Sequence, residues 1–255
     1  MKIIHTPEEW KKIRSGIASD KKIGFVPTMG GLHNGHLSLV QKCRKENDIS
    51  VVSVYLNPTQ FNDKNDLLTY PANFEDDSAL LEKAGVDYLF APDYSAMYPD
   101  GYTYKVIETD FSQKLCGAKR PGHFDGVLTV VMKLFNIIRP QNAYFGEKDF
   151  QQYVLLDGMV KAFFMDIHLV PCPIVREENG LAISSRNRKL SEKGLAAAAP
   201  KLHEILENES SLEQKKNELE TSGFTVDYIT EHNGRLYAAA FLEGVRLIDN
   251  IPLKG

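Results

Sequence analysis

Cysteine is scarce in this 255-residue sequence, which contains only Cys43, Cys116 and Cys172. The three are far apart, their number is odd, and no pair has the C-x-x-C spacing of a metal or redox site. A disulfide framework is therefore excluded as the basis of the fold. We expect reduced thiols, as in a cytoplasmic protein.

Long apolar stretches and an excess of one charge are also missing. No segment approaches the length of a membrane span, and the first ten residues lack the apolar run and cleavage site of a signal peptide. Basic residues are mixed with acids along the chain, and the formal net charge is −4. We therefore expect a soluble cytoplasmic protein that binds neither membrane nor nucleic acid.

The composition suits a globular protein, because 43% of the residues are hydrophobic and 25% are charged. Strand-like apolar runs alternate with helical patterns over the first two thirds of the chain. Strands are expected near residues 22–26, 49–56, 86–90, 143–145 and 167–170, with helices starting near Gly35, Asn73, Gly126 and Phe150. This alternation predicts an α/β fold, with a parallel sheet covered by helices on both faces. Ligands bind beyond the carboxyl ends of such strands, so the loops at Thr28, Asn57 and Gly146 should converge on one cleft.

The character of the chain changes near Ser184. Helical patterns around residues 191–207 and 212–219 precede alternating strand patterns at residues 226–231, 236–240 and 245–248. We expect a main domain over residues 1–183 and a small α+β C-terminal domain over residues 184–255.

The first candidate site, residues 27–36, combines a strand end, a glycine turn and two histidines at a helix start. Glycines let backbone N–H groups approach a ligand, a helix N-terminus favours negative charge, and imidazoles can donate to phosphate oxygens. The segment therefore favours phosphate binding, although it is neither a Walker loop nor G-x-G-x-x-G. Capping or surface histidines are one alternative. A zinc site is another, weakened because no cysteine or carboxylate lies at a familiar spacing from either histidine.

The second candidate site is the segment Phe145–Gln152, again a strand end followed by a helix start. Lys148 offers a mobile positive charge to phosphate, and Asp149 can cap the helix that carries Gln152. An ordinary charged loop, with Glu147 and Lys148 in solvent, is the alternative.

The third candidate site is the segment Ile183–Arg186. Ser184 and Ser185 supply hydroxyl groups and Arg186 a guanidinium, a combination that can bind terminal phosphates and neutralise charge on departing pyrophosphate. The same residues could equally form a helix cap.

Together these segments resemble the pantothenate synthetases. The similarity runs from about residue 3 to residue 190 and resumes at Arg246–Asn250. It rests on residues 27–36, Asn57–Phe61, Arg120–Phe124, Phe145–Gln152 and Ser184–Asn187, in matching order and spacing. The resemblance implies a Rossmann-like fold of the nucleotidyltransferase superfamily, related to class I aminoacyl-tRNA synthetases, with its H-x-G-H motif at His33–His36. The chain departs from the family mainly in its C-terminal part, which looks short and divergent between Asn208 and Asn233.

The resemblance also implies a reaction on the route to coenzyme A. ATP and (R)-pantoate would give pantoyl adenylate and pyrophosphate, and β-alanine would then attack the adenylate to give pantothenate and AMP. Mg²⁺ is expected to travel with ATP, because it prefers phosphate oxygens and water to an all-protein site. Asp76 and Asp77 could reach it through water, although acids in a first helical turn more often complement the helix dipole. A homodimer is expected from the family.

The residues expected to act on ATP come from all three candidate sites. We assign catalytic roles to His33, His36, Lys148 and Arg186, with His36 as the proton donor. The expected ATP site comprises Met29, Gly30, Gly31, Leu32, His33, Asn34, Gly35, His36, Gly146, Glu147, Lys148, Asp149, Val175, Ile183, Ser184, Ser185 and Arg186. No side chain is expected to bind a metal directly.

The acceptor residues are taken from the resemblance. Gln60 and Gln152 would hold pantoate, and Gln60 would also face β-alanine, because a neutral amide can both donate and accept hydrogen bonds. Arg120 and His123 would belong to the same cleft without a defined role.

Three rival functions share parts of this pattern. A nucleotidyltransferase acting on a phosphorylated acceptor would need cationic groups where Gln60 and Gln152 stand. A catalytically inactive nucleotide-binding module would not need His36, Lys148 and Arg186 together. A tRNA synthetase would need a longer chain for its anticodon domain.

Overall fold

The computed structural model describes residues 1–253, which form two compact units. Unit 1 comprises Met1–Gly146 and Gln151–Cys172, and unit 2 comprises Glu147–Phe150 and the chain from Pro173 onward. The short segment Glu147–Phe150 therefore packs with the C-terminal part of the chain, although unit 1 flanks it on both sides. The functional division expected at residue 183 stays a prediction.

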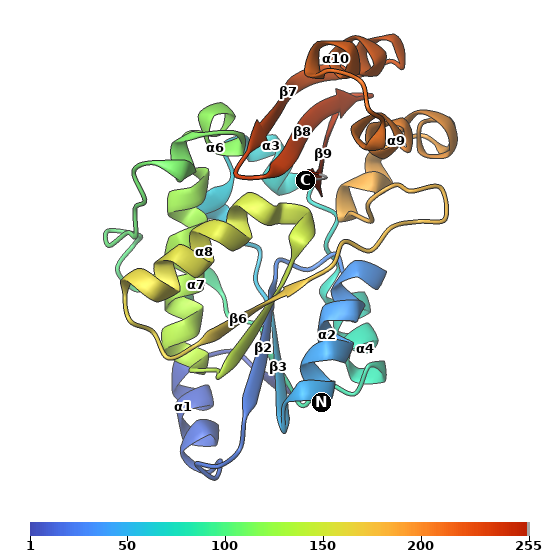
Figure 1. The fold of residues 1–255 in the computed structure, drawn as a ribbon. Coiled ribbons are helices and arrows are strands. Elements are labelled where there is room, and N and C mark those ends of the chain that lie inside the picture. The colour runs from blue at the N-terminus through green and yellow to red at the C-terminus, as the bar shows by residue number, and fades with distance from the viewer. Residues whose placement is uncertain (254–255) are drawn as a thin grey trace. The chain divides into compact units, whose positions relative to one another are not determined.

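Unit 1 is built on a parallel sheet, as predicted (Figure 1); it has six strands, and the edge strand at Lys2–Ile4 was not expected from the sequence. In spatial order its strands are β1 (Lys2–Ile4), β4 (Tyr88–Phe90), β3 (Ile49–Val54), β2 (Ile23–Thr28), β5 (Asn142–Gly146) and β6 (His168–Cys172). From β2 the chain continues to β3 and β4 on one side, and it later enters β5 and β6 on the other. The strand order thus reverses between β2 and β5, the place where open α/β sheets bind ligands.

Helices cover both faces of this sheet. The helices α1 (Pro7–Ser15), α7 (His123–Ile138) and α8 (Phe150–Ala162) lie on one face, and α2 (Asn34–Glu46) and α4 (Phe74–Lys83) lie on the other (Figure 1). Side chains of a strand alternate between faces, so Phe25 packs into the core of the first face and Val26 into that of the second. Because the strands are buried on both faces, their sequences are almost continuously apolar and rich in β-branched residues.

Several connections in unit 1 are more structured than the sequence suggests. The connection after β3, residues 57–71, contains a 3₁₀ turn, η1 (Pro58–Gln60), and a short helix, α3 (Lys64–Leu68). Asn57 and Asp63 cap these elements by accepting backbone N–H bonds, an effect too local for periodicity to reveal. The remaining short elements are α5 (Tyr94–Met97), η2 (Phe111–Gln113) and α6 (Cys116–Lys119).

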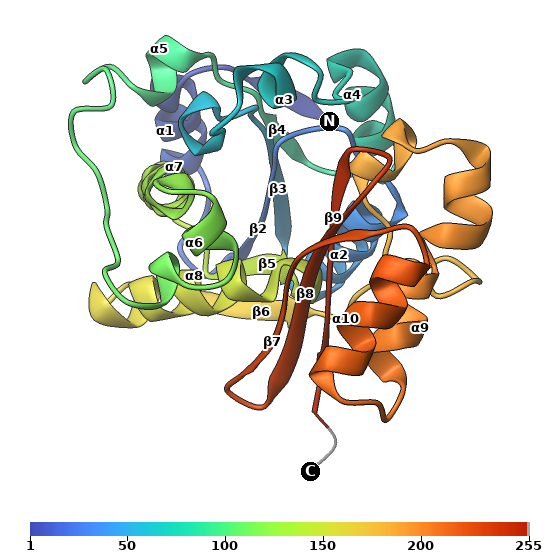
Figure 2. The same cartoon turned by 90° about the horizontal axis from the view of Figure 1, so that it is seen from above.

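Unit 2 contains an antiparallel sheet of β7 (Thr225–His232), β8 (Arg235–Leu242) and β9 (Val245–Pro252), in that order. Both hairpins turn through two residues with positive φ, Asn233-Gly234 and Glu243-Gly244, which suits the twist of the strands. The helices α9 (Lys201–Glu207) and α10 (Leu212–Thr221) lie on one side of this sheet (Figure 2). A small α+β C-terminal part is therefore confirmed.

One helix prediction in unit 2 was wrong. Residues 191–207 do not form a single α-helix, because a π-helical turn, η5 (Gly194–Ala198), precedes α9. Pro200 stands between them and has no N–H with which to continue an α-helical ladder. The ammonium of Lys215 closes the far end of α9 by donating to the carbonyls of Ile205 (2.8 Å) and Leu206 (3.1 Å).

The helices between residues 1 and 253 all fall short of the length and apolarity that a membrane crossing requires.

The contact between α7 and η1 depends on Gly126. A Cβ atom at this position would lie 2.5 Å from the carbonyl oxygen of Thr59 and 2.7 Å from the nitrogen of Gln60. We expect Gly126→Ala to displace η1 and to lower the free energy of unfolding by about 1–3 kcal/mol, measured by chemical denaturation. Gly158 is the control, because its Cβ would meet open space. Gly158→Ala should stabilise α8 by about 0.5–1 kcal/mol, and an equal loss in both variants would contradict this steric account.

Candidate active site

The segment at the end of β2, residues 28–32, forms a glycine turn held by Asp77. Gly30 and Gly31 have φ values of +83° and +66°, which favour glycine. The Asp77 carboxylate, only 4% exposed, accepts the backbone N–H of Gly31 (2.8 Å) and of Leu32 (2.7 Å). Asp77 therefore does more than complement the dipole of α4, because it fixes the course of this turn.

The two histidines of the H-x-G-H motif stand at the start of α2, as predicted. His33 is the N-cap residue, and its ring lies 4.0 Å from that of His36, centroid to centroid, with 35° between the planes. A Cβ atom at Gly35 would lie 2.9 Å from Cε1 of His33, so glycine lets the His33 ring fold back over the helix. The first turn of this 13-residue helix carries no acid. Its N-terminus and paired imidazoles can therefore receive an anion.

Asn57 is the centre of a buried hydrogen-bond network after β3. It is 1% exposed, and its Oδ1 accepts hydrogen bonds from the hydroxyls of Thr59 and Tyr98, both at 2.9 Å. Its Nδ2 donates to Oε1 of Gln60 (2.9 Å) and to the carbonyl of Gly126 (3.2 Å). Burial raises the pKa of Tyr98 to about 12, so this hydroxyl keeps its proton at neutral pH.

The orientation of the Gln60 amide follows from this network. Oε1 of Gln60 is occupied by Asn57, so its Nε2 group points elsewhere and has no hydrogen-bond partner among residues 1–253. Gln60 itself is 7% exposed. The result is a fixed, neutral donor that can bind a carboxylate or a hydroxyl oxygen.

Arg120 and His123 hold the backbone at Gln60. The carbonyl of Gln60 lies 2.7 Å from Nδ1 of His123 and accepts from Nη2 of Arg120 at 3.3 Å. Nε2 of His123 lies 3.1 Å from Nη1 of Arg120. A guanidinium only donates, so Nε2 accepts and the hydrogen of this neutral imidazole is on Nδ1. The sequence offered no role for either residue.

Two adjacent glutamines at the start of α8 differ in their surroundings. Gln151 is 4% exposed, and its Nε2 donates to the carbonyls of Phe111 and Lys114, both at 2.8 Å. Gln152 is half-buried, and no hydrogen bond to its amide occurs within the described chain. Gln151 therefore holds the segment before α7, whereas the amide of Gln152 can bind a ligand.

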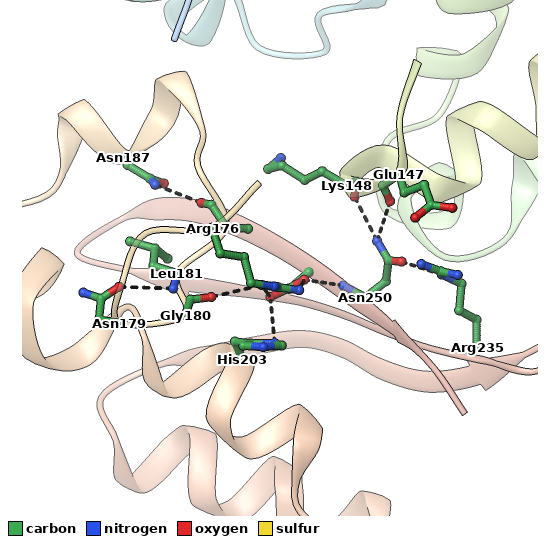
Figure 3. Close-up of polar contacts among 12 residues, drawn as sticks. Glu147, Lys148, Arg176, Asn179, Gly180, Leu181, Asn187, His203, Arg235 and Asn250 are labelled. Atoms are coloured by element: carbon green, nitrogen blue, oxygen red, sulfur yellow. Dashed lines mark hydrogen bonds and ion pairs between the residues drawn. The ribbon is translucent and has the colours of Figure 1, made fainter. Parts of the chain in front are cut away.

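Lys148 lies in unit 2, on the 3₁₀ turn η3 (Glu147–Asp149) that links β5 to α8 (Figure 3). Its side chain is 20% exposed, and Nζ lies 3.6 Å from Oδ2 of Asp149. The carbonyls of Glu147 and Lys148 both accept from Nδ2 of Asn250 at 3.0 Å. The helix cap expected at Asp149 stays a prediction.

The third candidate segment follows a hairpin turn in unit 2, whose two arms are joined by an isolated antiparallel bridge between Arg176 and Ala182. Val175 and Ile183 lie across the hairpin from each other, and the N–H of Ile183 donates to the carbonyl of Val175 at 3.0 Å. Ser184 then caps the 3₁₀ helix η4 (Ser185–Lys189) by accepting the N–H of Arg186 at 3.3 Å. The helix cap that the sequence suggested as an alternative role for this segment is therefore confirmed. Ser185 is 6% exposed.

The candidate ATP-site residues are divided between the units. Residues 29–36 and Gly146 belong to unit 1, as do Gln60 and Gln152. Glu147, Lys148, Asp149, Val175, Ile183, Ser184, Ser185 and Arg186 belong to unit 2. Within residues 1–253, no group of three or more histidine, cysteine or acidic side chains is arranged to hold a metal.

A glycine turn and paired histidines at the reversal point of a parallel sheet define a class, the α/β proteins that bind phosphate-bearing ligands at the carboxyl ends of their strands. The model of the family described as pantoate-beta-alanine ligase matches residues 2–252 of the chain. The chain belongs to this family, whose enzymes are ligases that join pantoate to β-alanine.

Similarity to individual relatives extends over nearly the whole chain. The pantothenate synthetase of Bdellovibrio bacteriovorus is 50% identical over 254 residues, which cover 98% of this chain and 99% of the relative. That of Coxiella burnetii strain RSA 331 is 48% identical over 251 residues, covering 98% and 96%.

Solved structures of the family superimpose closely. The pantoate-beta-alanine ligase of Francisella tularensis, crystallised with beta-gamma ATP and beta-alanine, gives a TM-score of 0.94 at 42% identity and covers 99% of this chain and 97% of its own. Pantothenate synthetase from Thermus thermophilus gives 0.89 at 39% identity over 100% of both chains.

The role of Asp77 can be tested with Asp77→Asn. The amide keeps the shape of the side chain but puts an N–H₂ group against one of the two backbone donors. We expect the free energy of unfolding to fall by about 1–3 kcal/mol, because a buried donor loses its acceptor. Ligase activity should fall at least about tenfold as the glycine turn shifts.

The control for this prediction is Asp76→Asn, which removes the same charge from the same helical turn at an exposed position. Its stability should stay within about 0.5 kcal/mol of the wild type. Similar losses of stability in both variants would show that Asp77 stabilises the protein through the helix dipole rather than through its two hydrogen bonds to backbone amides.

Proposed function

We propose that this enzyme makes pantothenate from (R)-pantoate and β-alanine in two steps, through a pantoyl adenylate, and releases pyrophosphate and AMP. The orientation of Gln60 carries the proposal, because a buried neutral donor suits a carboxylate or hydroxyl substrate. A phosphorylated acceptor would call for a cation at this place. The Francisella relative was crystallised with beta-gamma ATP and beta-alanine, which supports these two compounds as ligands.

The chemistry explains why ATP is used. A carboxylate is a poor acyl electrophile, because its charge repels nucleophiles and oxide does not leave. Transfer of AMP to the pantoate carboxylate breaks the bond between the α- and β-phosphates and forms an acyl phosphate. The amine of β-alanine then attacks the acyl carbon, and AMP leaves with the bonding electrons.

The phosphate-binding residues act by placing positive charge and donors where charge develops. We assign His33, His36 and the N-terminus of α2 to the nucleotide phosphates, with His36 as the proton donor. Lys148 and Arg186 neutralise the departing pyrophosphate, and the hydroxyls of Ser184 and Ser185 donate to its oxygens.

The remaining ATP contacts are assigned to backbone and shape. They involve Met29, Gly30, Gly31, Leu32, Asn34, Gly35, Gly146, Glu147, Asp149, Val175 and Ile183. A Cβ atom added at Gly146 would meet open space in the protein, so the structure leaves room beside this strand end for a ligand to approach the backbone. Gln60 and Gln152 hold pantoate, and Gln60 also binds β-alanine.

Three further features are proposed from the family and the composition. Mg²⁺ enters with ATP and offsets phosphate charge. Asp77 is buried and holds the glycine turn, so the exposed Asp76 is the more accessible of the two acids for a contact with the ion through water. The enzyme acts in the cytoplasm. It works as a homodimer.

The two-step route predicts a specific isotope exchange. Labelled pyrophosphate should enter ATP only when pantoate is present, because exchange requires reversal of adenylate formation. AMP release should require β-alanine in addition. Exchange that is indifferent to pantoate would contradict the proposed function and would favour a different adenylyl acceptor.

The roles of His36 and Lys148 predict large losses of turnover. His36→Ala and Lys148→Ala should each lower kcat at least about a hundredfold, because each removes a contact that strengthens in the transition state. The melting temperature should change little, since both side chains lie at loop or helix ends. His168→Ala and Lys161→Ala, both at exposed positions, are the controls and should keep wild-type kcat. Near-normal turnover in either active-site variant would remove that residue from the mechanism.

A further inference from the structure

Two adjacent residues of β9, Asp249 and Asn250, are polar and yet 3% and 2% exposed. Neither has been given a role in the reaction above. Buried polar side chains are costly unless each of their atoms has a partner. Their partners therefore indicate what they do.

The amide of Asn250 holds the turn that carries Lys148. Its Nδ2 donates to the carbonyls of Glu147 and Lys148, both at 3.0 Å, and its Oδ1 accepts from Nε of Arg235 at 2.5 Å (Figure 3). A guanidinium only donates and a carbonyl only accepts, so the amide has a single allowed orientation. The guanidinium of Arg235 also lies 3.9 Å above the ring of Phe150, the first residue of α8, which directly follows this turn. Asn250 and Arg235 thus contact η3 and the residue that follows it.

The carboxylate of Asp249 holds the hairpin that leads to Ser184. It accepts two hydrogen bonds from Arg176, with Nη1 at 2.6 Å and Nη2 at 2.9 Å, and Nδ1 of His203 lies 3.6 Å from the same group. Nη1 of Arg176 also donates to the carbonyl of Gly180 at 3.1 Å. A bidentate pair of this kind fixes both distance and orientation. Asp249 therefore anchors the hairpin of Val175 and Ile183, which ends where the cap of η4 begins.

We infer that Asp249 and Asn250 are positioning residues for adenylation. Together they fix the Lys148 turn and the segment Ser184–Arg186 to the same strand, β9. This inference rests on the proposed function of Lys148 and Arg186. Side chains of successive strand residues leave on opposite sides, so one dipeptide can serve two segments. The pyrophosphate needs both cations at fixed places, and a displacement of about 1 Å can cost up to a hundredfold in rate.

The test is Asn250→Asp, which keeps the shape of the side chain and its contact with Arg235. A carboxylate oxygen would then face the two carbonyl oxygens that now accept hydrogen bonds, and the Lys148 turn should move away. We expect single-turnover formation of the adenylate to slow by about ten- to a hundredfold, with the KM for β-alanine unchanged. Asn217→Asp, which adds the same charge at an exposed position of α10, should behave as the wild type.

A double-mutant cycle separates positioning from general destabilisation. If Asn250 acts through Lys148, Asn250→Asp should slow Lys148→Ala by less than about twofold, because the group that it positions is already gone. Arg235→Met offers the same cycle without a new charge, and it carries the test if Asn250→Asp does not fold. Asp249→Asn combined with Arg186→Ala applies the same logic to the hairpin.

Two results would overturn the inference: wild-type adenylation in the Asn250→Asp and Arg235→Met variants, or losses that simply multiply with that of Lys148→Ala. Both results differ from a failure of the proposed function. If the proposed function were wrong, the wild-type enzyme itself would show no pantoate-dependent exchange of pyrophosphate into ATP.

Discussion

The carboxylate of Asp77 is the contact on which the first half of the site depends. A turn with two consecutive left-handed glycines has many alternatives in the unfolded chain, and its N–H groups must find acceptors when they are buried. Asp77 supplies both acceptors from a helix 45 residues further along the chain. The position of this glycine turn determines where α2 begins, and therefore where His33 and His36 lie.

Buried amides do similar work elsewhere in the molecule. Asn57 in unit 1 and Asn250 in unit 2 each connect a group that donates to its oxygen with carbonyl oxygens that accept from its nitrogen. An amide is suited to this task because its two ends differ in polarity and neither is charged. The carbonyl of Gly126 can only accept, so it fixes the orientation of the Asn57 amide, and Asn57 in turn fixes which end of the Gln60 amide remains available.

Much of the fold was predictable because it follows from local patterns. The alternation of buried strands and amphipathic helices gave the parallel sheet, and Asn73 does cap α4. The long-range contacts were not predictable. The partner of Gly31 is 46 residues away and that of Lys148 is 102, and no periodicity connects such positions. The resemblance named the segments that contain Asn57 and Asp249, but only the hydrogen bonds show what these side chains hold. The roles of the expected catalytic residues stay predictions.

The assignment of Glu147–Phe150 to the C-terminal unit has a consequence for how this enzyme can change over evolution. The chain leaves unit 1 for four residues and then returns to it, so no single cut separates the two units cleanly. A C-terminal portion acquired from a divergent homologue would have to match a loop encoded a hundred residues earlier. Recombination near Pro173 would replace β9 but keep the lysine turn, and the hydrogen bonds between Asn250 and that turn could be lost. β9 and the lysine turn are therefore constrained to be inherited together.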